Sequence, residues 1–241
     1  MSPCRPRHAP RLSIALLLFA ATSAIAADAP QVSPARDAAA AGMVDVATLA
    51  PDIEVGMRYL GADNFTGAPV PGYEANRCYL LRPAAEALAR VQASLRGTGL
   101  RLRIFDCYRP VRAVHAFVAW AAAADDPASK ARYYPDLDKS ALVPDYIADR
   151  SGHSRGATVD LTLLACEAGA CTPLDMGTDF DLFGPAAHTE APGLPAQVRD
   201  NRRRLVEAMQ QAGFVNYPLE WWHFSLRPEP DPATAYDFRV R

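Results

Sequence analysis

Residues 151–160, Ser-Gly-His-Ser-Arg-Gly-Ala-Thr-Val-Asp, open the stretch that decides the fold of this 241-residue chain. Apolar and polar side chains alternate over 157–163, which predicts a β-strand with one face in the core. Asp160 lies on the polar face of this strand, where water is scarce. An unpaired carboxylate is costly there, so it needs a partner or a metal ion. His153 precedes the strand beside Gly156, where the chain can turn sharply.

An imidazole and a carboxylate that converge from a turn and a strand suit a zinc ion. A lone His–Asp pair is more often a structural hydrogen bond, so this stretch alone favours the structural interpretation. A second stretch, Glu220-Trp221-Trp222-His223-Phe224, adds another imidazole and another acid between large aromatic side chains. Aromatic walls exclude water and strengthen the charge interactions within a pocket. Together the two stretches favour a metal site.

The remaining pattern indicates an α+β fold: a single domain with a small, mainly antiparallel sheet flanked by helices. Periodicity and the positions of Gly and Pro predict helices at 83–95, 110–124 and 201–212, and strands at 100–105, 157–164, 214–217 and 221–226. Loops are expected at 61–73 and over most of 165–198, with a surface excursion at 125–150.

The first 26 residues have the features of a secretory signal peptide. A basic start with three arginines is followed by an apolar run at 12–21 and by the small-residue cleavage signal Ala24-Ile25-Ala26. The apolar run is too short to span a bilayer stably, and no later run is long enough. The sequence therefore predicts export, to the periplasm, with a flexible leader at 27–42 and one domain at 43–241.

Charge excludes some classes of partner. The full chain has a formal net charge of −2, and removal of residues 1–26 leaves 22 basic against 27 acidic residues, a formal charge of −5. A negative chain is a poor match for nucleic acid or for an anionic membrane surface. The sequence does not fix the oligomeric state.

Four cysteines remain after the predicted cleavage, and an even number in an exported chain indicates disulfides. Cys166 and Cys171 bracket a turn-like Glu-Ala-Gly-Ala insert, which suits a small closed loop and leaves Cys78 to pair with Cys107. Three connectivities are compatible with the sequence alone.

Several motifs, in one order along the chain, resemble the D-alanyl-D-alanine dipeptidases, the VanX-type members of the zinc D,D-peptidase superfamily (peptidase family M15). The resemblance spans about 43–227 and is carried by NFTG at 64–67, PGYEANRCYLL at 71–81, FDCYRP at 105–110, SGHSRGATVD at 151–160, DMGTDFDLF at 175–183 and EWWHF at 220–224. It implies a Hedgehog- or D,D-peptidase-like fold and zinc-dependent hydrolysis of the dipeptide D-Ala-D-Ala.

The resemblance also implies roles for individual residues. His153, Asp160 and His223 would hold one Zn²⁺ and leave a fourth position open, as catalytic zinc sites do. Glu220 would be the general base, an assignment that rests on the motif because spacing does not show where its side chain points. Arg109 would polarise the scissile carbonyl and stabilise the oxyanion.

The same resemblance assigns recognition of the free amino terminus of the substrate to Ser151 and Asp181, with Glu220 sharing that role. Two further acids, Asp175 and Asp179, lie close to Asp181 in the sequence and leave that assignment open.

Three alternatives stay open at this point. A D,D-carboxypeptidase of the same superfamily would share the catalytic core and trim peptidoglycan stem peptides. A cysteine hydrolase would use Cys107 with a histidine, and a wall-binding module would carry an inactive site. An exported dipeptidase meets dipeptide released from the wall, so salvage or wall turnover is expected rather than antibiotic resistance.

Overall fold

The computed structural model describes residues 29–241, so the expected signal peptide, apart from Met1, lies outside the described residues. The helices are α1 Arg82–Leu95, α2 Val111–Ala122, α3 Pro127–Tyr133 and α4 Ala196–Gln211. The strands are β1 Gln31–Val32, β2 Met43–Asp45, β3 Glu54–Val55, β4 Tyr79–Leu81, β5 Leu100–Asp106, β6 Thr158–Glu167, β7 Ala170–Pro173, β8 Phe214–Asn216, β9 His223–Leu226 and β10 Thr234–Ala235.

A six-stranded sheet forms the centre of the domain, with the order β3-β5-β6-β9-β8 and β7 paired to β6. Its pairs are antiparallel except for β3 with β5. Two small sheets, β1 with β10 and β2 with β4, lie beside it. The prediction of one mixed α/β domain with a mainly antiparallel sheet is confirmed.

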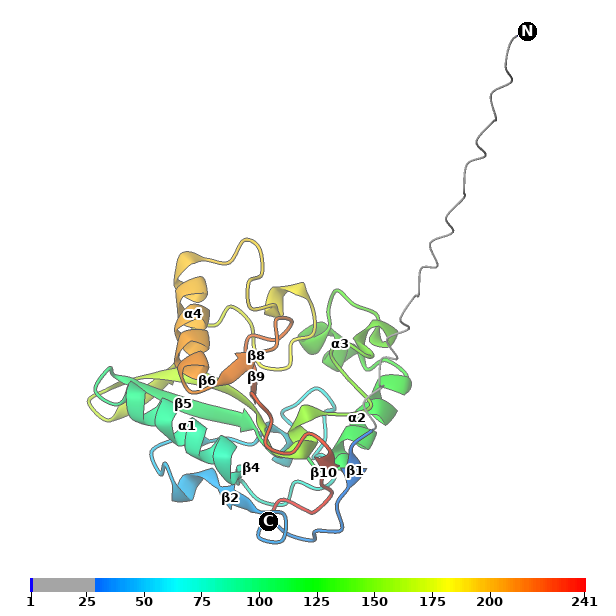
Figure 1. Ribbon diagram of the computed structural model, residues 1–241. Coiled ribbons are helices and arrows are strands. Elements are labelled where there is room, and N and C mark those ends of the chain that lie inside the picture. The colour runs from blue at the N-terminus through cyan, green and yellow to red at the C-terminus, as the bar shows by residue number, and fades with distance from the viewer. Residues whose placement is uncertain (2–28) are drawn as a thin grey trace.

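Helices α1 and α4 pack on the central sheet and on each other. Each buries an apolar stripe at helical spacing, for example Leu88, Val91 and Leu95 on α1. In Figure 1, α1 lies along β5 and α4 stands beside β6 and β8, whereas α2 and α3 lie together at the other end of the sheet. None of the helices within 29–241 combines the length and hydrophobicity needed to cross a bilayer.

Strand β6 is buried on both faces, from Thr158 to Leu164, whereas the alternation predicted one face in the core. The polar face of β6 is covered by loops and aromatic side chains instead of water. Thr158 and Asp160 are each 2% exposed or less. The polar residues of this strand therefore lie in an interior site.

Other differences concern segments without a strong periodic signal. The expected leader lies against the domain from residue 31, because β1 pairs with β10 and Ala41 packs into the core. The expected surface excursion contains α3, whose first turn is capped by the Asp126 carboxylate accepting from Ser129 N. Helix α4 begins at Ala196, five residues before the predicted start, because Pro195 provides its N-cap conformation.

Candidate active site

The pairing of β6 with β5 and with β9 brings three polar side chains of the site together. Asp160 on β6 lies directly opposite Asp106 on β5 and opposite His223 on β9. Directly paired residues on neighbouring strands point to the same face of the sheet. His153 reaches this group from a 3₁₀ turn, Gly152–Arg155, that ends at Gly156 with φ 74°. The left-handed φ favours glycine there and sends the chain straight into β6.

The His153 ring is held in one orientation and one tautomer. Its Nδ1 donates to the carbonyl oxygen of Cys107 at 2.7 Å, so the lone pair of the neutral ring lies on Nε2. Nε2 lies 3.2 Å from Asp160 Oδ2 and 3.3 Å from His223 Nδ1. Burial lowers the pKa of His153, which keeps the ring neutral, the form that coordinates a metal.

The donor atoms of His153, Asp160 and His223 all lie within 4.8 Å of one another. His223 Nδ1 is 3.0 Å from Asp160 Oδ1, yet this buried oxygen accepts no well-aligned hydrogen bond from any described residue. Burial opposes ionisation of Asp160, but the two imidazoles outweigh it and hold the pKa of this carboxyl below its usual range. Two imidazole nitrogens and an ionised carboxylate facing one point form a donor set that fits zinc.

A disulfide supports this arrangement from behind. Cys78 and Cys107 are bonded and fully buried, and the bond joins the segment before β4 to the end of β5. It thereby fixes the backbone whose carbonyl orients His153. The second disulfide, Cys166–Cys171, closes the hairpin of β6 and β7. Because the sulfur of Cys107 is in a disulfide, a cysteine hydrolase would lack its nucleophile.

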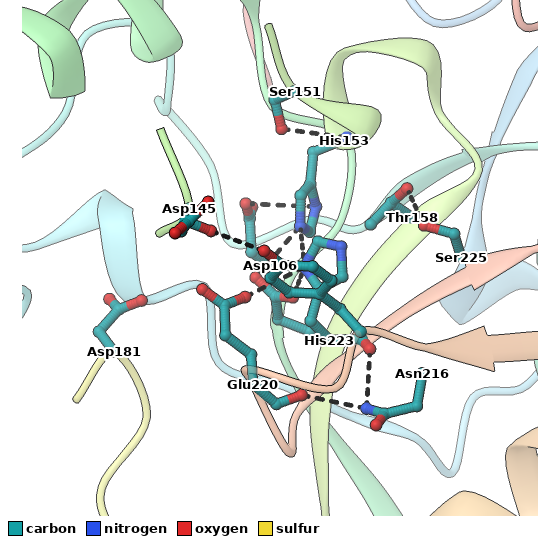
Figure 2. Close-up of polar contacts among 12 residues, drawn as sticks. Asp106, Asp145, Ser151, His153, Thr158, Asp181, Asn216, Glu220, His223 and Ser225 are labelled. Atoms are coloured by element: carbon teal, nitrogen blue, oxygen red, sulfur yellow. Dashed lines mark hydrogen bonds and ion pairs between the residues drawn. The ribbon is translucent and has the colours of Figure 1, made fainter. Parts of the chain in front are cut away.

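Glu220 lies in the turn between β8 and β9, and its Oε2 is 3.5 Å from His223 Nδ1. Asn216 braces this turn by donating from Nδ2 to the carbonyl oxygens of Glu220 and His223 at 3.0 and 3.1 Å (Figure 2). Burial, together with the charge of Asp160, raises the pKa of Glu220 well above its usual value. That shift is in the direction expected of a general base near neutral pH.

Arg109 follows β5 and is held by a buried acid. Its Nε donates to Asp106 Oδ2 at 2.9 Å, and its Nη2 lies 3.5 Å from Asp160 Oδ2. Tyr73 Oη donates to the other oxygen of Asp106 at 2.7 Å, so that carboxylate is fixed from two sides. The guanidinium carbon lies 5.0 Å from the centre of the Phe117 ring. Arg109 is therefore a cation of fixed position beside Asp160.

Asp181 is the acid of the DMGTDFDLF motif that enters the site. It is 4% exposed and adopts φ 65°, whereas the side chain of Asp179 is 72% exposed. Its Oδ1 accepts from Tyr59 Oη at 2.9 Å, and its buried Oδ2 has no partner among the described residues. An unsatisfied buried carboxylate oxygen is costly, so Oδ2 is available to accept a hydrogen bond from a group bound in the cavity.

In Figure 2 Ser151 lies next to His153, and Asp181 lies apart from it on the side of Glu220; both residues line the same cavity. The sequence predicted that Ser151 and Asp181 act together on one end of the substrate. The Ser151 Oγ accepts from His153 N at 3.2 Å, and its hydroxyl proton has no partner within residues 29–241. Both residues border the cavity, and their joint role at one end of the substrate stays a prediction.

The residues of the site border one cavity. Its volume is about 220 Å³, which is smaller than the roughly 300–1,000 Å³ of pockets that bind drug-sized ligands. All seven residues predicted to serve the chemistry line it: Arg109, Ser151, His153, Asp160, Asp181, Glu220 and His223. Residues 144–150, expected on the surface, form another part of its wall. Tyr217 Oη fastens this wall by donating to Asp145 O at 2.9 Å, and Tyr146 Oη is 2.9 Å from His188 Nε2.

Sequence reasoning missed Tyr59, Asn216 and the 144–150 wall. Asp106 lies beside Arg109 in the FDCYRP motif, and the ion pair that this neighbourhood suggests is present. Nothing in the local pattern around Tyr59 or 144–150 indicates proximity to His153.

Comparison with known proteins gives consistent results. The family model described as D-ala-D-ala dipeptidase matches residues 39–241. A D-alanyl-D-alanine dipeptidase of Enterococcus faecium is 41% identical over 76% of this chain and 91% of its own length. Dipeptidases of the same name from Streptomyces coelicolor and Escherichia coli are 42% and 36% identical, each over 76% of this chain and over 90% and 84% of their own lengths.

Among solved structures, the vancomycin-resistance D,D-pentapeptidase VanY in complex with Zn(II) aligns with 63% of this chain and 75% of its own. The sequence identity is 16% and the TM-score 0.38. A likeness of this degree supports no argument about the chain.

Proposed function

This chain belongs to the D-Ala-D-Ala dipeptidases of peptidase family M15, and we propose on that premise that His153, Asp160 and His223 hold the zinc ion of its active site. The protein is a metallopeptidase that hydrolyses D-Ala-D-Ala to free D-alanine. The observation that carries the site assignment is that the three donor atoms converge in one small cavity with Glu220 and Arg109. The Hedgehog and D,D-peptidase type of fold is part of the same proposal, supported by family membership.

Two of the ligand residues are prepared for coordination by their surroundings. His153 offers the lone pair of Nε2 because Cys107 O accepts its Nδ1 proton, and the pKa of Asp160 lies below its usual range. A zinc ion held by these residues would supply Lewis acidity and would lower the pKa of water toward neutrality. Three protein ligands, rather than four, leave room for the reacting groups.

Glu220 moves the proton. Its carboxylate borders the cavity beside His223 without belonging to the converging donor group. Oε2 accepts a proton from the attacking water and delivers it to the nitrogen of the leaving D-alanine. Bond cleavage therefore needs no second titrating residue. The raised pKa of Glu220 makes both transfers feasible near neutral pH.

Arg109 stabilises charge on the substrate. Its Nε is occupied by Asp106, which leaves other guanidinium N–H groups to donate to the scissile carbonyl oxygen as that oxygen becomes negative. The arginine is already in place before substrate arrives, so little reorganisation is needed during the reaction.

Arg109→Lys is expected to lower kcat about 100- to 1,000-fold with zinc content unchanged, because an ammonium on a flexible stem does not reproduce a guanidinium fixed by Asp106. Steady-state kinetics with D-Ala-D-Ala and metal analysis of the same samples measure this. Arg96→Lys, which alters an exposed arginine–carboxylate pair with Asp52, is the matched control and should leave kcat unchanged. A kcat of Arg109→Lys close to that of the wild type would show that Arg109 does not stabilise the oxyanion.

Specificity for a dipeptide follows from the acidic end of the cavity. Asp181 and Glu220 lie near each other there and suit the free ammonium group of the substrate, and the orphaned Oδ2 of Asp181 supports this assignment. An acyl group on that nitrogen removes the positive charge that these two acids would bind.

The assay that tests the function compares D-Ala-D-Ala with an N-acylated tripeptide that ends in D-Ala-D-Ala. Rapid cleavage of the dipeptide and little cleavage of the blocked peptide are expected. Comparable or faster cleavage of the blocked peptide would instead identify a D,D-carboxypeptidase.

We further infer that the protein is exported and acts on dipeptide released from the cell wall, in turnover or salvage. The signal-like composition of 1–26 and two disulfides support this inference, because disulfides persist in oxidising compartments. Recovery of the uncleaved chain from the cytoplasm of its native cell would contradict it.

A further inference from the structure

The proposed substrate carries a charge at each end, and the function described above provides a partner for only one of them. Asp181 and Glu220 suit the ammonium group. The carboxylate of the second D-alanine also loses water on entering the cavity, and a desolvated carboxylate needs a cation or several hydrogen-bond donors. Such a partner should line the same cavity, on the side away from Asp181.

Two arginines line the cavity, Arg109 and Arg150. Arg109 is already engaged by Asp106 and lies 3.5 Å from Asp160, at the group that surrounds the scissile bond. Its position serves the carbonyl oxygen rather than the end of the substrate. Consecutive Cα atoms are 3.8 Å apart, so the carboxylate lies about one residue farther along.

Arg150 has the charge and the freedom that this role requires. It ends the 144–150 wall, and within residues 29–241 its side chain forms no ion pair and donates no hydrogen bond to another residue. It also lines a second cavity of about 190 Å³ that shares Val114 and Ser151 with the first. Arg150 therefore borders both the active-site cavity and the neighbouring cavity, next to Ser151.

Ser151 adds a donor at the same place. It directly follows Arg150, and Figure 2 shows it next to His153 and apart from Asp181. Its Oγ accepts from His153 N, and its O–H proton has no partner among the described residues. A hydroxyl with a free proton suits an anion, since a carboxylate can only accept hydrogen bonds.

We propose that Arg150, assisted by the Ser151 hydroxyl, binds the α-carboxylate of the second D-alanine and thereby restricts the enzyme to substrates with a free carboxyl end next to the scissile bond. The inference rests on the proposed dipeptidase function. It assigns the two ends of the cavity to opposite charges: acids at the Asp181 end for the ammonium, and Arg150 at the Ser151 end for the carboxylate.

The test compares D-Ala-D-Ala with D-alanyl-D-alaninamide, which has the same scissile bond and a neutral end. Arg150→Gln is expected to lower kcat/KM for the dipeptide about 10- to 100-fold, mainly through KM, because a hydrogen-bonded charge pair is lost. Its kcat/KM for the amide should equal that of the wild type, so the preference for the free acid disappears. Arg150→Lys should retain part of that preference.

Arg90→Gln is the matched control, because Arg90 is exposed on α1 and forms no ion pair within the described chain. A binding measurement separates recognition from chemistry. In the Glu220→Gln background, adding Arg150→Gln should weaken the Kd for D-Ala-D-Ala measured by calorimetry by a similar factor of about 10 to 100.

An equal loss for the dipeptide and the amide would show that Arg150 acts through the fold of the 144–150 wall, and would overturn the proposal. Unchanged kinetics with both substrates would overturn it as well. If the wild type does not cleave the dipeptide, the proposed function itself is refuted, and the inference about Arg150 is refuted with it.

Discussion

Glu220→Gln is expected to lower kcat for D-Ala-D-Ala by about 100- to 10,000-fold, the range that general acid–base catalysis contributes. Glutamine keeps the shape of the side chain and its place in the turn braced by Asn216, but it cannot accept a proton. Because the converging donor atoms come from three other residues, zinc content should stay unchanged. Steady-state kinetics and metal analysis of one preparation measure both quantities.

The exposed acid Glu207 on α4 offers the matched control, and Glu207→Gln should behave like the wild type. Two outcomes would contradict the role of Glu220. Persistent turnover would mean that another group takes the proton, and loss of zinc would make Glu220 a ligand. A chain that binds wall fragments but lacks turnover even as the wild type would support the wall-binding alternative.

The second large effect is expected from loss of the metal. Asp160→Asn keeps the shape but removes the charge that faces both imidazoles, at distances of 3.0 Å to His223 Nδ1 and 3.2 Å to His153 Nε2. Changes to residues that only orient ligands already cost 10- to 100-fold in metal affinity, so loss of the one anionic ligand should cost more. Turnover should fall to background at zinc concentrations that saturate the wild type.

Metal titration followed by activity measurement tests this expectation. A chelator should abolish the activity of the wild type, and added zinc should restore it. Asp138→Asn is the control, because the Asp138 side chain is 90% exposed on the surface. Full activity of the chelated wild type would refute the metal mechanism, and unchanged zinc affinity of Asp160→Asn would refute the ligand set.

Local pattern accounts for much of the fold. The alternation over 157–163 corresponds to β6, the amphipathic run at 83–95 to α1, and the alternation at 100–105 to β5. These predictions succeed because periods of two and of 3.6 residues reflect which side chains of one element can share a face. The motifs also identified seven residues that line one cavity, although their roles came from resemblance and not from spacing.

Local sequence pattern predicts the secondary structure that carries the ligands and the kinds of side chain available for the reaction. The pairing of Asp160 with Asp106 and His223, and the use of 144–150 as a cavity wall, depend on the tertiary structure. The physical reason is distance along the chain. Cross-strand register and loop docking depend on contacts between residues tens of positions apart, and no local periodicity records them.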